Sequence, residues 1–397
     1  MREVYIVGAA RTPIGRVGGA LAALSAVELG TIAVTEALRR AGAAPTAVQE
    51  LVMGQVIQAG AGSNPARQVS LLAGLPVHVP SFTVNMVCAS GMKAVQQAAR
   101  SVACGDSDLV VAGGMESMSA APYLLDRARS GYRLGDGTLV DAITRDALQD
   151  PLGRYHMAMT AETLAEEMAI TREEQDAFAL ASQRKAAEAA RAGAFRAEIA
   201  PVELPPVRRG AEAVRLLVDE HPRPDTDAAS LAALKPAFKQ GGTVTAGNAS
   251  GINDGAAALV LASGSAVRSH GLVPMGMIVA CASCGVEPQR MGLGPVPATR
   301  AALAQAGLTL ADIDLAELNE AFAAQALAVT RELGLDPGRV NVNGGAIALG
   351  HPVGASGARI LVTLLHALKA RGKKTGLATL CVGGGQGMAL IVSTGDG

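Results

Sequence analysis

The sequence predicts an α/β protein built from two similar halves, and three observations favour this fold class. Hydrophobic residues make up 49% of the 397 residues, against 17% charged and 2% aromatic, and glycine occurs 47 times. Such a composition indicates buried elements rich in Ala, Val and Leu, joined by tight strand–helix turns. Strand-like and helical patterns alternate near both ends of the chain, and the pattern of the first part recurs in the last.

The first part of the chain is expected to alternate strands and helices. In order we expect a strand at 4–7, a Gly/Pro-containing loop at 11–19, a helix at 27–40 that ends at Gly42, a short strand at 51–55, a helix at 63–73, a loop at 76–80, a strand that holds Cys88, a helix, and a buried strand at 109–112 that ends at Gly113 and Gly114. The helix after Cys88 is amphipathic, because Met92, Val95, Ala99 and Val102 recur at spacings of three and four.

Residues 119–242 are predicted to form an inserted loop domain, since this segment is more charged and richer in proline. Its one clear helix begins at the capping box Thr171…Glu174 and fades at Gly193. The irregular stretch that follows carries Pro201, Pro205, Pro206, Pro222, Pro224 and Pro236. The buried pattern returns at 243–263, which assigns 1–118 and 243–274 to an N-terminal half and 275–397 to a C-terminal half.

The C-terminal half repeats the N-terminal one. Ala37-Leu38-x-x-Ala41-Gly42 is matched by Ala302-Leu303-x-x-Ala306-Gly307, and Ala89-Ser90-Gly91 is matched by Ala355-Ser356-Gly357. Val-Asn precedes each tripeptide, and an amphipathic helix, a glycine, an apolar strand and a glycine run follow it. Matches in the same order at a nearly constant offset predict duplicated halves about a pseudo-twofold axis, with corresponding turns face to face.

Cys88 is the first candidate for chemistry. It stands in V-N-M-V-C-A-S-G at 84–91, between an apolar strand and a helix. The helix dipole and unpaired amides at such a point favour a thiolate, although free cysteines are also common as inert packing.

Three further glycine-rich or turn-forming stretches contain polar groups. They are N-E-A-F at 319–322, N-G-G-A-I-A-L-G-H-P-V-G-A-S-G at 343–357, and C-V-G-G-G-Q-G at 381–387. Of the six histidines, only His351 lies in so glycine-rich a turn. An isolated histidine or strand cysteine could equally be a satisfied core residue.

Together these blocks resemble the signatures of the thiolase family, the acetyl-CoA C-acetyltransferases and 3-ketoacyl-CoA thiolases. The strings Y-H-M at 155–157 and G-T-V-T-A-G-N-A-S at 242–250 fit as well, and the likeness covers essentially the whole chain. The resemblance implies two βαβαβαββ halves in a layered α-β-α-β-α arrangement plus an inserted loop domain. The chain departs from the family pattern at Met86, where relatives often have a basic residue, and at Ala89, where glycine is common.

The resemblance also implies catalytic roles. Cys88 would be the acyl-accepting nucleophile, His351 would accept its proton, and Cys381 would be the second acid/base. The amides of Cys88 and Gly383 would hold the acyl-enzyme oxygen, and His351 with a water on Asn319 would hold the enolate oxygen. An imidazole with its ordinary pKa can both accept and donate a proton near neutral pH. A cysteine thioester can be displaced by the next thiol.

Contacts to coenzyme A carry over less directly. By similarity Arg223 would lie near the nucleotide end, and a pantetheine tunnel would be lined by Leu148, His156, Met157, Phe238, Ala246, Ser250, Met291, Ala321 and Phe322. Coenzyme A and acyl-CoA would be substrates, with no prosthetic group. The chain has no Walker or Rossmann phosphate loop, and the lone Cys281-x-x-Cys284 does not predict a metal site.

Charge and targeting signals limit the partners and the cell compartment that we expect. The formal net charge is −1, without long blocks of like charge, so neither nucleic acid nor a membrane surface is an expected partner. Five scattered cysteines and an N-terminus without a signal-peptide pattern favour the cytoplasm. Family members are homodimers or homotetramers that act in fatty acid metabolism, and residues 123–137 could form a tetramerisation loop.

Three functions remain open on the sequence alone. The first is a thiolase that makes or cleaves acetoacetyl-CoA, with a degradative thiolase of broader chain length as its variant, which the string D-E-H-P-R at 219–223 keeps open. The second is a decarboxylating β-ketoacyl synthase, which would pair a cysteine with two histidines. The third is a non-catalytic acyl-CoA- or lipid-binding relative.

Overall fold

A computed structural model describes residues 2–204 and 214–395. Pro205 and Pro206 of the predicted loop domain therefore lie outside the described residues. The N-terminal half contains β1 (Val4–Arg11), β2 (Gly15–Arg16), α1 (Ala26–Ala41), β3 (Glu50–Gly54), α2 (Pro65–Leu72), β4 (Ser81–Val84), α3 (Ser90–Cys104), β5 (Leu109–Ser117), β10 (Asn253–Ser263) and α7 (Gly264–Ser269).

The C-terminal half has matching elements. They are β11 (Gly276–Gly285), α8 (Pro295–Ala306), β12 (Leu315–Leu318), α9 (Ala323–Leu333), α10 (Ala346–Leu349), α11 (Val353–Ala370), β13 (Thr375–Val382) and β14 (Gln386–Ser393). Strands run β1-β10-β5-β3-β4 in one half and β11-β14-β13-β12 in the other. In both halves, two antiparallel strand pairings are followed by parallel ones. The second half has no counterpart of β4 among its described strands, and a single parallel bridge between Ala316 and Val340 takes that place.

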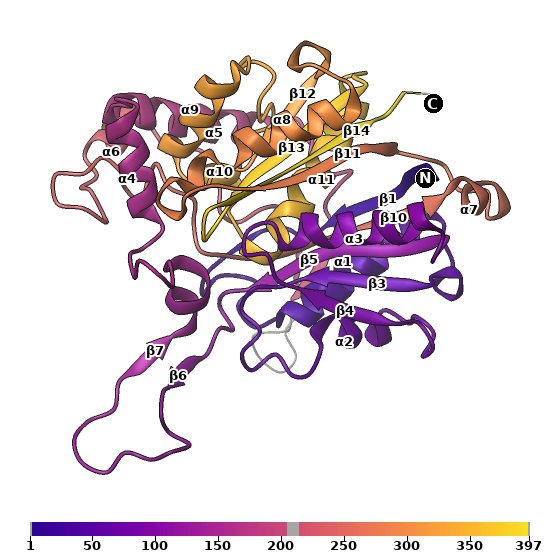
Figure 1. The fold of residues 1–397 in the computed structure, drawn as a ribbon, viewed down its shortest axis with the longest axis horizontal. Coiled ribbons are helices and arrows are strands. Elements are labelled where there is room, and N and C mark those ends of the chain that lie inside the picture. The colour runs from indigo at the N-terminus through magenta and orange to yellow at the C-terminus, as the bar shows by residue number, and fades with distance from the viewer. Residues whose placement is uncertain (1, 205–213, 396–397) are drawn as a thin grey trace.

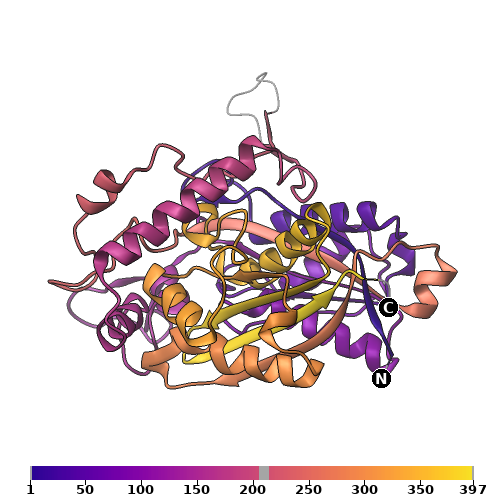
Figure 2. The same cartoon turned by 90° about the horizontal axis from the view of Figure 1, so that it is seen from above.

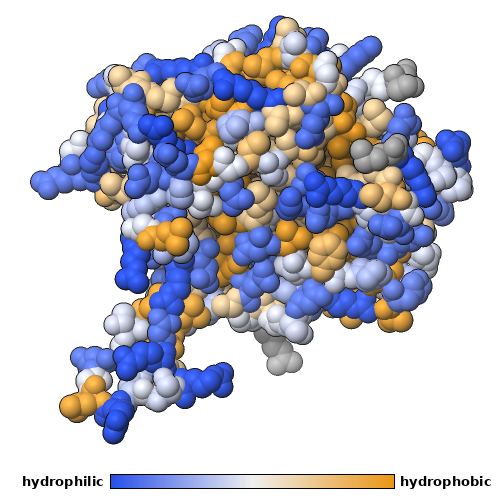
Figure 3. Space-filling model, viewed as in Figure 1, coloured by the Kyte–Doolittle hydropathy of each residue, from blue (hydrophilic) through white to orange (hydrophobic). Residues whose placement is uncertain are grey.

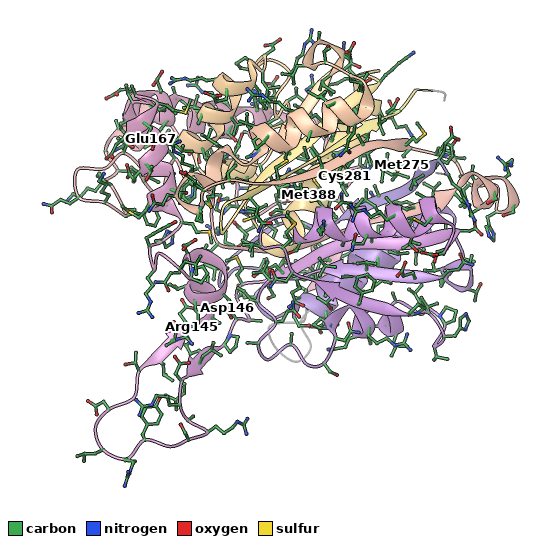
Figure 4. The ribbon with its side chains drawn as sticks, viewed as in Figure 1. Arg145, Asp146, Glu167, Met275, Cys281 and Met388 are labelled. Carbon is green, nitrogen blue, oxygen red and sulfur yellow. The ribbon has the colours of Figure 1, made fainter. Side chains whose placement is uncertain are left out.

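The two sheets and their helices form five layers, as the predicted fold class requires (Figure 1). Helices α3 and α11 lie between the sheets, where Met92 and Leu361 share one core with inward residues of both, such as Leu259 and Leu390. Helices α1 and α2 cover the outer face of one sheet, and α8 and α9 cover the other. Figure 4 labels Met388 and Cys281, of β14 and β11, near the middle of this stack.

A short pairing between Tyr5 and Met277 joins β1 to β11, so the sheets meet along one edge. The repeated Ala-Leu-x-x-Ala-Gly segments form the ends of α1 and α8. Gly42 and Gly307 close these helices at φ 67° and φ 66°, a left-handed conformation that glycine adopts without strain.

The region between the halves contains short elements and one long helix. They are β6 (Tyr123–Leu125), β7 (Leu139–Asp141), a π-helix (Ile143–Leu148), α4 (Ala158–Glu167), α5 (Arg172–Arg191), β8 (Val202–Leu204), β9 (Val214–Leu216) and α6 (Ala228–Ala232). Helix α5 begins at the predicted capping box of Thr171 and Glu174, and Figure 2 shows it flanking the C-terminal half. No helix within the described ranges has the length and apolar character needed to cross a bilayer.

Two predicted strand boundaries are wrong. Strand β5 does not stop at Gly113 and Gly114 but continues through them to Ser117. The glycines are needed for close approach, because a Cβ at Gly113 would lie 2.1 Å from the carbonyl oxygen of Ala257 and one at Gly114 would lie 2.1 Å from that of Gly354. Strand β4 ends at Val84, so Cys88 lies in the turn after the strand rather than within it.

Candidate active site

Cys88 and His351, from opposite halves of the fold, line one internal cavity of about 160 Å³. Its remaining walls are mainly apolar and come from both halves of the fold and from the inserted region. They include Met118, Leu148, Met157, Met291, Phe322 and Val353. The duplicated turns therefore converge as predicted.

The turn that carries Cys88 is strained and tightly held. Val87 has a φ of 46°, which a β-branched residue rarely adopts and which is common near active sites. The Ser90 hydroxyl donates to the Val87 carbonyl at 2.6 Å and accepts from the Met86 amide at 2.9 Å. Asn85 Oδ1 accepts from the Val87 amide at 3.0 Å, so both sides of the turn are fixed.

Burial makes Cys88 a neutral thiol at rest, contrary to the thiolate expected from the helix terminus. Desolvation raises the pKa of Cys88 to about 11, and the charge of Glu116 adds to the rise. The main-chain N–H groups of Gly383 and of Cys88 itself face the sulfur and oppose this effect. These are the two amides that the resemblance assigned to the acyl-enzyme oxygen.

The hydrogen bonds of His351 determine its tautomer. Ser356 Oγ lies 2.9 Å from the Pro352 carbonyl and 2.5 Å from His351 Nδ1. Because the hydroxyl gives its one hydrogen to the carbonyl, its oxygen accepts from Nδ1–H. Nε2 therefore carries the lone pair, and Asn319 Nδ2 approaches it at 3.4 Å.

His351 is also neutral at rest, so the expectation of an imidazole that titrates near neutral pH is wrong. Desolvation lowers the pKa of His351 to about 3, and Arg359 lowers it further. Proton transfer from Cys88 must therefore accompany attack on a substrate rather than precede it. Asn319 Oδ1 is buried and has no hydrogen-bond partner among the described residues, which leaves an acceptor for a water or a substrate.

Cys381 lies near Cys88 but does not line the cavity. It is fully buried near the end of β13, and desolvation raises the pKa of its thiol, with the nearby Cys88 sulfur as the second cause. Gly383 follows in the turn between β13 and β14. A Cβ there would lie 2.3 Å from the terminal methyl of Met157, so a larger residue at 383 would displace this flexible cavity side chain.

Eight of the ten residues predicted to contact coenzyme A line this inner cavity. They are Leu148, His156, Met157, Phe238, Ser250, Met291, Ala321 and Phe322. The His156 ring stacks on Phe238 with centroids 4.6 Å apart. The Ser250 amide donates to the Ala321 carbonyl at 3.0 Å, which ties two of the predicted loops together.

Arg223 and Ala246, the other two, line an outer pocket of about 420 Å³. His221 also lines this pocket and packs against Gly251 of the inner cavity, where a Cβ would lie 2.3 Å from its ring. The two spaces therefore adjoin. Burial lowers the pKa of His221 to about 4, and the positive charge of Arg223 is the second cause. The Nδ1 atom of His221 has no hydrogen-bond partner among the described residues.

Sequence reasoning missed the residues that hold the His351 turn. Asn253 Oδ1 accepts from the His351 amide at 2.9 Å, and the Glu320 carboxylate accepts from Ser182 at 2.7 Å and from the Ile347 amide at 3.1 Å. Ser356, within the glycine-rich turn, also holds the imidazole of His351. The usable signal was a carboxyl or amide group inside an otherwise apolar segment, since such groups are buried only with partners.

Comparison with known proteins shows the family of the chain. Residues 4–265 match the description "Thiolase, N-terminal domain" and residues 272–394 match "Thiolase, C-terminal domain". The chain is 58% identical over 393 residues to an acetyl-CoA acetyltransferase of Escherichia coli and 54% identical over 392 residues to one of Cupriavidus necator, with 99% of each chain covered in both cases.

Solved structures agree as well. An acetyl-CoA acetyltransferase from Syntrophomonas wolfei superposes with a TM-score of 0.97 at 45% identity and full coverage of both chains. A human mitochondrial 3-ketoacyl-CoA thiolase in complex with CoA gives 0.95 at 44% identity, covering 99% of this chain and 98% of that one. With both domain descriptions matched and relatives similar over their full length, this chain belongs to the thiolase family.

Proposed function

We propose that the protein is an acetyl-CoA C-acetyltransferase, which joins two molecules of acetyl-CoA into acetoacetyl-CoA and CoA or runs the reverse thiolysis. The observation that carries this proposal is the convergence of Cys88, His351 Nε2 and the Gly383 amide from the two halves, with the Cys381 thiol beside Cys88. This arrangement supplies a nucleophile, a base, an oxyanion donor and a second acid.

In the first half-reaction, Cys88 Sγ attacks the acetyl-CoA carbonyl while its proton moves to His351 Nε2. The amides of Cys88 and Gly383 donate to the oxyanion that forms, a contribution that is worth about 10²–10³ in rate for one such donor. The C–S bond to CoA then breaks. The leaving CoA sulfur takes the Cys381 proton, which leaves acetyl-Cys88, an imidazolium and a Cys381 thiolate.

In the second half-reaction, the Cys381 thiolate removes a proton from the methyl group of another acetyl-CoA. The imidazolium Nε2–H, and a water on Asn319, donate to the enolate oxygen. The enolate carbon attacks the acetyl carbonyl on Cys88, and the departing sulfur recovers its proton from His351. Every group returns to its resting state, so two neutral thiols and a neutral imidazole are a consistent starting point.

The test is thiolysis of acetoacetyl-CoA by CoA, followed as loss of the substrate's absorbance, together with intact mass after addition of acetyl-CoA. We expect turnover and one added acetyl group, both lost in Cys88→Ala. Absence of thiolysis in the wild-type protein would favour a β-ketoacyl synthase or a non-catalytic binding protein. A synthase is disfavoured because a cysteine, not a second histidine, stands beside Cys88.

A degradative thiolase of broader chain length is the second candidate, supported by the similarity to the human 3-ketoacyl-CoA thiolase at a TM-score of 0.96. The relatives from Escherichia coli and Cupriavidus necator, at 58% and 54% identity, are acetyl-CoA acetyltransferases, which favours the short-chain reaction. A series of 3-ketoacyl-CoA substrates of increasing chain length separates the two. A kcat/KM that rises with chain length would overturn the acetoacetyl-CoA assignment.

For coenzyme A we propose that the pantetheine arm occupies the inner cavity and that Arg223 meets the nucleotide end in the outer pocket. The inserted loop domain, residues 119–242, would supply half of the ten predicted contact residues. We expect Arg223→Ala to raise KM for acetyl-CoA but not for acetyl-pantetheine, which lacks the nucleotide. Equal effects on both substrates would place Arg223 elsewhere.

We further propose a cytoplasmic homo-oligomer, dimer or tetramer, that acts in fatty acid metabolism. Edge strand β4 exposes Phe82, and Leu72 and Val77 beside it are 63% and 79% exposed. The β6–β7 hairpin projects from the body as an arm, and Figure 3 shows hydrophobic side chains on this mostly hydrophilic extension. Phe82→Lys should reduce the mass measured by light scattering; a monomeric wild-type protein would exclude both states.

A further inference from the structure

Glu116 is a buried carboxylate that the proposed reaction does not use. It is fully buried in β5, inside the otherwise apolar stretch Leu109–Ser117, and it does not line the cavity. Carboxylates are rarely buried without a specific set of partners, so its contacts indicate what it does.

The partners of Glu116 come from both halves of the fold. Its Oε2 accepts from the Val56 amide at 3.0 Å and from the Gly354 amide at 2.9 Å, and its Oε1 accepts from the Ile57 amide at 3.2 Å. Gly354 lies in the first turn of α11, where main-chain N–H groups have no partner within the helix. A carboxylate is the side chain that can accept from three amides at two oxygens without presenting a hydrogen of its own.

The fit around this contact is close. A Cβ at Gly354 would lie 2.7 Å from Glu116 Oε2 and 2.6 Å from the Met115 carbonyl oxygen. On the neighbouring strand β10, Gly255 pairs with Glu116, and Asn253 accepts from the His351 amide at 2.9 Å. Two adjacent strands of the N-terminal half therefore hold both ends of the segment from His351 to Gly354.

We propose that Glu116 is a positioning residue for His351: by holding the Gly354 amide, it fixes the imidazole of the C-terminal half relative to Cys88 of the N-terminal half. The inference rests on the proposed function, because it takes His351 as the group that receives the Cys88 proton. Glu116 touches neither substrate nor reacting atoms.

The charge of Glu116 provides a second, independent signature. Burial raises the pKa of Glu116 to about 8, against the three amide hydrogen bonds that lower it, and its charge contributes to the raised pKa of Cys88. Asp254 adds to the rise at Glu116. Above about pH 8, where Glu116 is ionised, removal of its charge should therefore lower the pKa of the Cys88 thiol even while it misplaces His351.

Glu116→Gln tests the proposal, because its amide NH₂ would face at least one of the three N–H groups. We expect kcat for acetoacetyl-CoA thiolysis to fall about 10–100-fold, the range for a small misplacement of a reacting group, with KM within about threefold of wild type. Alkylation of Cys88 by iodoacetamide should shift to lower pH. A variant with lower thermal stability but unchanged kcat and alkylation profile would overturn the proposal.

Glu198→Gln is the matched control. Glu198 is equally buried and binds Arg11 at 2.6 Å, with no contact to the His351 turn, so we expect lost stability without lost kcat. If Glu116→Gln does not fold, Gly354→Ala moves the same segment from its other side and should give the same loss of kcat. Failure of the proposed function would be distinct, because the wild-type protein would then show no thiolysis.

Discussion

Gly91 of α3 and Gly357 of α11 let the two helices pack closely. Gly91 packs against Ala358, the residue after Gly357, and Gly357 packs against Met92, the residue after Gly91. A Cβ at Gly91 would lie 2.9 Å from the main-chain nitrogen of Ala358, and one at Gly357 would lie 2.6 Å from that of Met92. The contact is reciprocal, as a pseudo-twofold axis between duplicated halves requires. It also brings together the two helix starts that follow Cys88 and His351.

Gly357→Ala should lower the free energy of unfolding by about 1–3 kcal/mol, because the added methyl group meets main-chain atoms that cannot move without separating the helices. Gly91→Ala should have a smaller effect, since its closest approach is longer. Urea denaturation followed by circular dichroism measures both.

Gly264→Ala is the control for these variants, because a Cβ there would meet only side-chain atoms at 3.5 Å and beyond. Equal stability of the variants at 357 and 264 would show that the helix contact is not close-packed.

The elements and the convergence of the site could be predicted from sequence because their signals are local. Glycines at 42 and 307 end matching helices, and Thr171 with Glu174 begins α5 as predicted. The repeated Ala-Ser-Gly predicted that two distant turns would meet, and the turns that carry Cys88 and His351 do line the same cavity.

The charge states and the supports of the site could not be predicted in this way. The pKa values of Cys88 and His351 depend on burial by elements hundreds of residues away, which outweighs the local helix dipole. The contact of Glu116 with Gly354 likewise joins segments that only the finished fold brings together.

Cys381→Ala should keep acylation but lose turnover. Cys88, His351 and the Gly383 amide remain, so intact mass should still show one acetyl group after addition of acetyl-CoA. Without the second acid/base, steady-state thiolysis should fall about 10²–10⁴-fold. Near-wild-type condensation by this variant would exclude Cys381 as the group that removes the methyl proton.

Ser356→Ala should impair His351 without changing substrate affinity. The hydroxyl fixes the proton on Nδ1, and its loss removes a hydrogen bond of about 1–2 kcal/mol, so kcat should fall about tenfold or more while KM stays within about twofold. Steady-state kinetics with acetoacetyl-CoA measure this split.

Ser90→Ala provides a contrast to Ser356→Ala, because Ser90 occupies the same place in the other repeat but holds the Cys88 turn. It should therefore slow acylation itself. Identical kinetic defects in the two variants would argue that neither serine acts through its own turn.

The alkylation rate of Cys88 should keep rising with pH. Because burial raises the pKa of this thiol to about 11, its reactive thiolate is a minor form at neutral pH and grows as the solution becomes more basic. Inactivation by iodoacetamide should therefore increase about tenfold per pH unit between about pH 7 and pH 10, without levelling. Peptide mass spectrometry assigns the modification to Cys88, and Cys88→Ser corrects for the other cysteines. A rate that levels by about pH 8 would instead indicate a thiolate stabilised by the helix terminus and the Gly383 amide, and would return the resting site to an ion pair with His351.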